Sequence, residues 1–174
     1  MILLLLLLSV MSVNSLERCI DYDSRANDIN SCCKIGLGLP IDPFLECLQT
    51  ANDLVPDREK HNFLACAFDC YAEKVGIIKN NTVVLEKIIE YIDELLGSQF
   101  GVDLRKTAWR TCATLAPKMA ADISGHKYKC NPFALEVQTC AQFEVNRICP
   151  ATVFDDEVAV CREVRSGIPH CIHK

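Results

Sequence analysis

The stretch CAFDCYAEKVGII, residues 66–78, places two cysteines four residues apart and ends a helical pattern at a glycine. Residues four apart lie on one face of a helix, so the side chains of Cys66 and Cys70 are expected to point the same way, one turn apart. Such a pair has three common uses: metal ligands, a redox-active pair, or anchors of two separate disulfides. The choice depends on the compartment in which the protein folds.

The first residues of the chain indicate export. An unbroken apolar run covers residues 2–8, and no charged residue precedes Glu17. A small residue, Ser15, lies where a cleavage site needs one, so we predict a signal peptide over residues 1–15 and a single mature domain over 16–174. The apolar run is too short for a membrane span, and no later run is long enough. We therefore expect a secreted, extracellular protein.

All 12 cysteines lie in the predicted mature chain, and an even, high count in an exported protein indicates disulfides. A zinc site at Cys66 and Cys70 would need further ligands, and the chain offers a conceivable set: His61, His170, Cys171 and His173. Because the compartment oxidises thiols, we predict no metal site. A thioredoxin-type pair has two intervening residues rather than three. We predict six disulfides, no free thiol, and different partners for Cys66 and Cys70.

Helical patterns cover most of the mature chain, and strand-like alternation is nearly absent. The clearest helix is expected over residues 82–96, with Thr82 as its N-cap and Gly97 as its end. Further helices are predicted as follows: from Asp42, from Asp57 to about Val75 before Gly76, from Asp103 to before Pro117, from Asn131 to about Cys149, and around Cys161. The predicted fold class is all-α, a compact disulfide-stapled bundle of about six to eight short helices.

Charge and motifs exclude several functions. The net charge of −5 argues against nucleic acid or an anionic membrane as the main partner. No cofactor motif was identified. The triplet Asn80-Asn81-Thr82 is an N-glycosylation sequon, which makes Asn80 a candidate glycan acceptor.

An enzyme is also disfavoured by the sequence. Secreted phospholipases A2 are small helical proteins with adjacent cysteines, but they need a histidine and an aspartate soon after the pair. Here Cys32-Cys33 is followed by Lys-Ile-Gly-Leu, and no histidine occurs before His61. No Gly-x-Ser-x-Gly motif is present either. We therefore predict that the protein is not an enzyme.

The spacing of the cysteines carries a further signal. After Cys70 come 41 residues to Cys112, 17 to Cys130, nine to Cys140 and eight to Cys149, which Pro150 follows directly. An adjacent pair of cysteines precedes Cys47. This pattern, which covers essentially the whole mature chain, resembles the insect odorant-binding proteins and in particular their cysteine-rich Plus-C subgroup.

The resemblance implies a set of disulfides. It matches the family's six core positions to Cys47, Cys66, Cys70, Cys112, Cys140 and Cys149. The family's interlocked pairing then implies the bonds Cys47–Cys70, Cys66–Cys140 and Cys112–Cys149. The partners of the other six stay open: Cys19, Cys32, Cys33, Cys130, Cys161 and Cys171. Cys32 and Cys33 are expected to have different partners, because joining neighbours strains the bridge.

The resemblance also implies a function. The protein is then expected to be a secreted carrier that binds and solubilises small apolar molecules of the odorant or pheromone type in an internal apolar cavity. An olfactory receptor and a homodimer are the further partners that it suggests. The expected cavity wall combines one face of the 82–96 helix with aromatic residues of its neighbours: Leu85, Ile88, Ile92, Leu96, Phe100, Trp109 and Phe143.

Two points qualify this expectation. By periodicity alone, the same residues would be interpreted as a packed core, and a secreted structural, defence or inhibitory protein without a small ligand is the alternative. In relatives of the family the C-terminal segment can help to close the pocket. Here that segment is longer, and Cys161 and Cys171 are expected to pin it, so a flexible lid is not expected.

Overall fold

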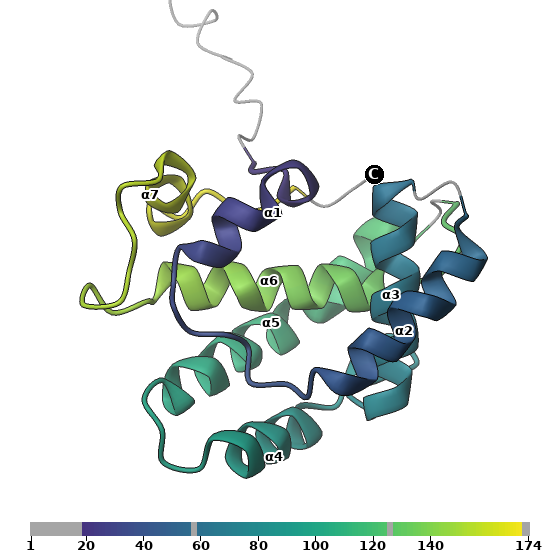
Figure 1. Cartoon of the computed structure of the whole chain (residues 1–174), viewed down its shortest axis with the longest axis horizontal. Helices are drawn as coiled ribbons and strands as arrows, with labels where there is room; N and C mark the ends of the chain where they lie inside the picture. The colour runs from purple at the N-terminus through teal and green to yellow at the C-terminus, as the bar shows by residue number, and fades with distance from the viewer. Residues whose placement is uncertain (1–18, 57–58, 125–126, 172–174) are drawn as a thin grey trace, which may run out of the picture.

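The computed structural model describes residues 19–56, 59–124 and 127–171. These residues form seven helices and one short antiparallel hairpin (Figure 1). The elements are α1 (Tyr22–Ser31), α2 (Asp42–Leu54), α3 (Lys60–Val75), β1 (Ile78–Lys79), β2 (Thr82–Val83), α4 (Leu85–Leu96), α5 (Val102–Ile123), α6 (Phe133–Arg147) and α7 (Ala159–Arg165). The predicted all-α fold class is confirmed. Within the described ranges, no helix has the length and apolar character that a membrane crossing requires.

Helix α6 runs through the middle of the molecule and is surrounded by other helices (Figure 1). It contacts α1, α3, α5 and α7. Within α6 only Arg147 is exposed, so even polar residues such as Asn146 are buried. The Asn146 amide donates a hydrogen bond of 2.7 Å to the carbonyl of Ile29 and so ties α6 to α1. Because α6 is covered on all sides, its sequence lacks the one-sided apolar pattern of a surface helix.

The apolar core of the described residues divides into four clusters, and two of them matter for the site. The larger of these two, called here the main core, lies among α3, α4, α5 and α6 and contains Ile88, Ile92 and Trp109. The smaller lies among α1, α6 and α7 and includes Ile29 and Val160. The main core therefore stabilises the central helices, while the chain ends pack around a much smaller cluster.

The segment between α1 and α2 crosses the main core and is fixed there by side chains of α5. Arg105 Nε donates to the carbonyl of Gly36 at 2.6 Å, and Trp109 Nε1 donates to that of Leu37 at 3.3 Å. Gly38 has a φ of 75°, and a Cβ at this position would lie 3.0 Å from a side-chain carbon of α4. Only glycine suits both the left-handed conformation and the close approach.

All 12 cysteines are joined in six disulfides, as predicted. Cys66 and Cys70 have different partners: Cys70 bonds to Cys47 of α2, and Cys66 bonds to Cys130 in the segment before α6. The cysteines of the stretch 66–78 are therefore two anchors of α3. Neither a thiol redox pair nor a metal clamp is formed.

Two of the implied pairings are wrong. Cys47–Cys70 is present, but Cys66 bonds to Cys130 rather than Cys140, and Cys112 bonds to Cys140 rather than Cys149. The reason is the packing of α5 against α6, which brings the Cα atoms of Cys112 and Cys140 to 5.9 Å.

Cys149 lies beyond the end of α6 and is bonded to Cys33, which follows α1. The other two bonds are Cys32–Cys161 and Cys19–Cys171. Cys32 and Cys33 therefore have different partners, as expected.

The six disulfides fall into two sets. In the inner set the six cysteines, numbered along the chain, pair first with third, second with fifth and fourth with sixth: Cys47–Cys70, Cys66–Cys130 and Cys112–Cys140. In the outer set each bond encloses the previous one: Cys33–Cys149, Cys32–Cys161 and Cys19–Cys171. The inner set is interlocked, whereas the outer set is nested.

Several predicted helices are present, but their boundaries differ at three places. Thr82 is not an N-cap, because it belongs to β2 and α4 begins only at Leu85. The hairpin has Asn80 and Asn81 at its tip, with φ of 51° and 54°. Asparagine tolerates this left-handed conformation, which two-residue hairpin turns require. The sequence pattern missed this hairpin because its strands are only two residues long.

Helix α5 does not end before Pro117, as predicted, but continues to Ile123. The proline removes one backbone hydrogen bond. The continued helix buries Ala116, Met119 and Ile123 in the main core, and this burial offsets the loss.

The predicted start of α3 at Asp57 lies outside the described residues. Its N-cap is Glu59, whose carboxylate accepts hydrogen bonds from the backbone N–H groups of His61 and Asn62. These bonds lower the pKa of Glu59. Gly76 ends the helix in the left-handed conformation, as expected.

Candidate functional site

The expected cavity wall is a packed surface. Ile88, Ile92 and Trp109 are fully buried in the main core, and Leu85 and Leu96 pack against it. Phe100 lies between α4 and α5 with 61% of its surface exposed. A face that fills a core and a face that lines a cavity carry the same apolar residues, which is why the sequence could not separate them. Only Phe143, of the seven predicted residues, lines the pocket described next.

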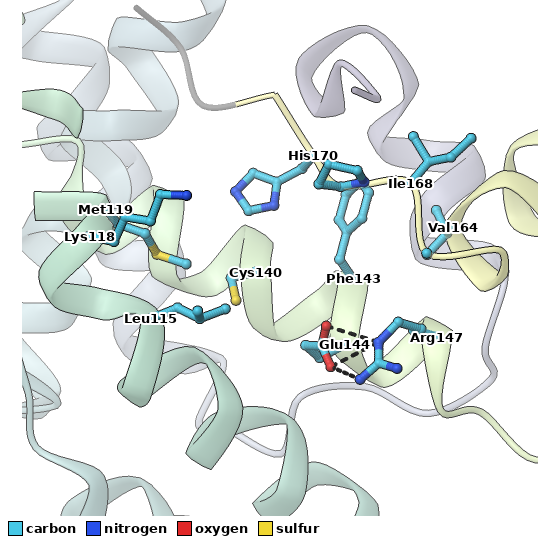
Figure 2. Close-up of a pocket in the computed structure, with 12 residues that line it drawn as sticks. Leu115, Lys118, Met119, Cys140, Phe143, Glu144, Arg147, Val164, Ile168 and His170 are labelled. Atoms are coloured by element: carbon cyan, nitrogen blue, oxygen red, sulfur yellow. Dashed lines mark hydrogen bonds and ion pairs between the residues drawn. The ribbon is translucent and has the colours of Figure 1, made fainter. Parts of the chain in front are cut away.

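A pocket of about 440 Å³ lies between α5, α6, α7 and residues 167–171, which we call the terminal segment (Figure 2). We call this site the C-terminal pocket. Its apolar lining comes from all four elements: Leu115, Met119, Phe143, Val164 and Ile168. Its polar lining is small and includes Lys118, Glu144, Arg147 and His170.

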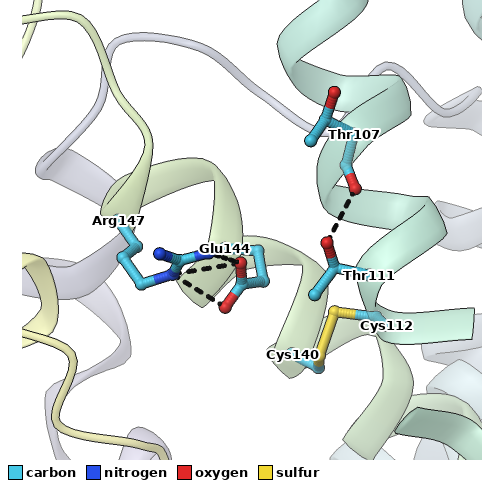
Figure 3. Close-up of polar contacts among 6 residues, drawn as sticks. All are labelled: Thr107, Thr111, Cys112, Cys140, Glu144 and Arg147. Carbon is cyan, nitrogen blue, oxygen red and sulfur yellow. Dashed lines mark hydrogen bonds and ion pairs between the residues drawn. A yellow bond between two sulfur atoms is a disulfide. The ribbon is translucent and has the colours of Figure 1, made fainter. Parts of the chain in front are cut away.

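One face of α6 forms the floor of the pocket. The α6 residues of the lining lie three, four and seven positions after Cys140, which places all of them on one side of the helix: Phe143, Glu144 and Arg147. Cys140 is bonded to Cys112 of α5, and this bond fixes the spacing of the two helices beside the pocket (Figure 3).

Helix α5 forms the second wall. It contributes Leu115, Lys118 and Met119, again at helical spacing. One turn before them, the hydroxyl of Thr111 donates to the carbonyl of Thr107 at 3.1 Å (Figure 3). That hydroxyl is therefore satisfied within its own helix.

The charged groups of the pocket differ in their pairing. Arg147 donates to the Glu144 carboxylate from Nε and Nη2, over 3.0 and 2.5 Å (Figures 2 and 3). These hydrogen bonds raise the pKa of Arg147 and neutralise both charges locally. Lys118 has no carboxylate partner among the residues that the structure describes. The unpaired charge in the pocket wall is therefore a cation.

The terminal segment is the third wall, and it is fixed on both sides. Ile20 donates to the carbonyl of Pro169 at 2.8 Å and accepts from the N–H of Cys171 at 2.9 Å. His170 Nε2 lies 3.5 Å from Glu136 Oε2 of α6, with the two side chains only 10% and 3% exposed. Together with the Cys19–Cys171 bond, these contacts pin the segment, as the cysteine pattern predicted.

A second, more open pocket of about 360 Å³ lies beside the segment between α1 and α2. Phe44, Phe68 and Tyr71 line one side, and Gln142 of α6 lines another. The Tyr71 hydroxyl donates to the carbonyl of Pro40 at 3.0 Å, and burial raises its pKa. This pocket is less enclosed than the C-terminal pocket.

The other predicted sites are located as follows. Asn80 is exposed at the tip of the hairpin, so the sequon is accessible, and its glycosylation stays a prediction. In the described part of the chain, no three His, Cys, Asp or Glu side chains are grouped as metal ligands. His173 of the conceivable zinc set lies outside that part.

Sequence reasoning missed most of the pocket. The helical spacing of Leu115, Lys118 and Met119 was a usable signal, but it gave no indication of what faces them. The opposing wall comes from Val164 and Ile168, which the outer disulfides and the packing of α7 bring into place.

Comparison of the chain with protein-family models, with curated proteins and with solved structures finds no match. Its function is therefore inferred from the site and the disulfides.

Proposed function

We propose that the protein is a secreted carrier, without catalytic activity, that binds small apolar or amphipathic molecules of the odorant or pheromone type. The observation that carries this proposal is the C-terminal pocket, a mostly apolar hollow of about 440 Å³ with a few polar groups. This size and composition are typical of small-molecule sites. The site differs from the cavity expected on the α4 face.

The disulfides support the proposal independently. The inner set pairs first with third, second with fifth and fourth with sixth, which is the interlocked order implied by the resemblance to odorant-binding proteins. The fifth and sixth positions are Cys130 and Cys140, one cysteine earlier than the spacing had indicated. Six disulfides in one chain are also typical of extracellular proteins.

The rigidity of the pocket favours binding. Its walls are held by Cys112–Cys140 and Cys19–Cys171 before any ligand arrives. Binding to a preorganised site avoids the entropy cost of ordering its walls. The expected further partners, an olfactory receptor or a second copy of the chain, stay predictions.

Blocking the pocket tests the proposal. Leu115 lines the pocket and is 43% exposed, so Leu115→Trp should be tolerated and should fill part of the hollow. We expect the wild-type protein to bind a fluorescent apolar probe at micromolar concentration and the variant to bind it about ten-fold more weakly, a loss of about 1.4 kcal/mol. Probe titration of purified protein measures the effect.

The matched control is Leu95→Trp on α4, which is 49% exposed and lies outside the pocket. It should bind the probe as the wild type does. If the wild type binds no apolar probe, or if the two variants bind equally well, the carrier proposal is refuted. The structural or defence alternative would then replace it.

A further inference from the structure

We propose that the C-terminal pocket selects amphipathic anions, with a long-chain carboxylate as the ligand type and Lys118 as the residue that binds its head. The inference rests on the proposed carrier function and adds a charge to the ligand. It commits to one orientation, in which the alkyl chain lies against the apolar wall and the carboxylate meets the ammonium group of Lys118.

The first support is the position of Lys118. It lies on α5 between two apolar residues of the pocket wall, Leu115 and Met119. Figure 2 shows its side chain on the same wall as these two. Lysine typically lays its methylene groups along apolar surface and holds its ammonium at the edge. A ligand whose chain occupies the pocket would therefore have its polar end within reach of this amine.

The second support is the charge balance of the lining. Arg147 and Glu144 neutralise each other through their bidentate contact, and His170 faces the buried carboxylate of Glu136. Among the charged side chains that line this pocket, Lys118 is the one without a carboxylate partner in the described part of the chain. An anionic head would complete the missing pair.

The expected selectivity follows from the exposure of Lys118. An ion pair at a solvent-exposed rim discriminates by about two- to five-fold. A carboxylate should therefore bind about two- to five-fold more tightly than the alcohol of the same chain length. Because rim charges are screened by salt, this ratio should shrink as the ionic strength rises.

The test uses three competitors with the same alkyl chain: laurate, lauryl alcohol and laurylamine. Each displaces a fluorescent apolar probe from the wild-type protein at neutral pH. We expect laurate to compete best and laurylamine worst. Lys118→Gln should remove the advantage of laurate over lauryl alcohol, and Lys118→Glu should favour the amine. Lys60→Gln, an exposed lysine on α3, is the control and should keep the wild-type order.

The outcomes separate the two proposals. If the wild-type protein binds no probe, the carrier function itself fails. If the probe binds but none of the three competitors displaces it, the long-chain carboxylate is overturned and the carrier function stands. If all three displace it equally well from the wild type, the protein is a carrier without charge selectivity and the present inference is overturned. A preference for laurate that persists in Lys118→Gln would place the head elsewhere and would overturn it as well.

Discussion

The two sets of disulfides stabilise two different kinds of structure. The inner set joins α2, α3, α5 and α6 around a main core that is already well packed. The outer set joins the two ends of the described chain, where α1 has 10 residues and α7 has seven and the two helices contact each other. Helices this short are not stable alone. The outer disulfides hold short helices that have little apolar packing of their own, whereas the inner disulfides connect helices that the main core already holds together.

Loop length alone would predict that the outer bonds stabilise the protein more than the inner bonds do. The outer bonds span 116 to 152 residues and the inner bonds only 23 to 64. In the chain-entropy model, longer loops give more stabilisation. In a nested set, however, each further bond closes only the short segments between it and the bond inside it. The contribution of one outer bond should therefore be smaller than its span suggests.

The largest effect is expected from removing an inner bond. Cys112 and Cys140 are buried, and replacing both by alanine removes a link between α5 and α6 and leaves unfilled volume. We expect the free energy of unfolding to fall by about 2–5 kcal/mol. Denaturant titration followed by circular dichroism measures it. A loss no greater than that of an outer double variant would contradict the distinction between the sets.

A smaller effect is expected from overfilling the main core. Ile88 has no exposed surface, so Ile88→Trp must force its neighbours apart. The cost should be about 1–3 kcal/mol. Thermal unfolding measures it, and a probe titration below the melting range should show unchanged affinity. A specific loss of affinity without a loss of stability would restore α4 as the cavity wall.

The smallest change in stability is expected at the outermost bond. Replacing Cys19 and Cys171 by alanine leaves the other two outer bonds intact and should cost less than about 2 kcal/mol. The same variant frees the terminal segment, so its affinity for an apolar probe should fall. Parallel measurement of unfolding and binding checks both. A variant that keeps full affinity would show that pinning this segment is not needed for binding.

The sequence predicted the parts of the fold that local chemistry determines. Gly76 ends α3. The side chain of Asn131 accepts a hydrogen bond from the N–H of Phe133 at the start of α6. Both helix ends agree with the sequence pattern. Local rules failed where packing or a turn outweighed them. Pro117 lies inside a helix because its neighbours are buried. Thr82 has the residue type of a cap, but the Asn80-Asn81 turn places it in a strand instead.

The site was harder to predict than the fold. Phe143 is predicted for a cavity on the α4 face and lies instead in the C-terminal pocket, and the sequence gives no indication that the terminal segment packs against α6. That placement depends on which cysteines pair, and spacing alone does not determine it. Once Cys32 is known to bond to Cys161 and Cys19 to Cys171, the two ends of the described chain must lie together, and the third wall of the pocket follows.

The outermost bond has a consequence for the covalent topology of the molecule. Since Cys19 is joined to Cys171, nearly the whole described chain is part of one closed ring. Cutting a ring once opens it but does not divide it. A protease that cleaves any single peptide bond between these two residues therefore releases no fragment. In an extracellular fluid that contains proteases, a nicked molecule would keep its pieces attached and its pocket walls in place.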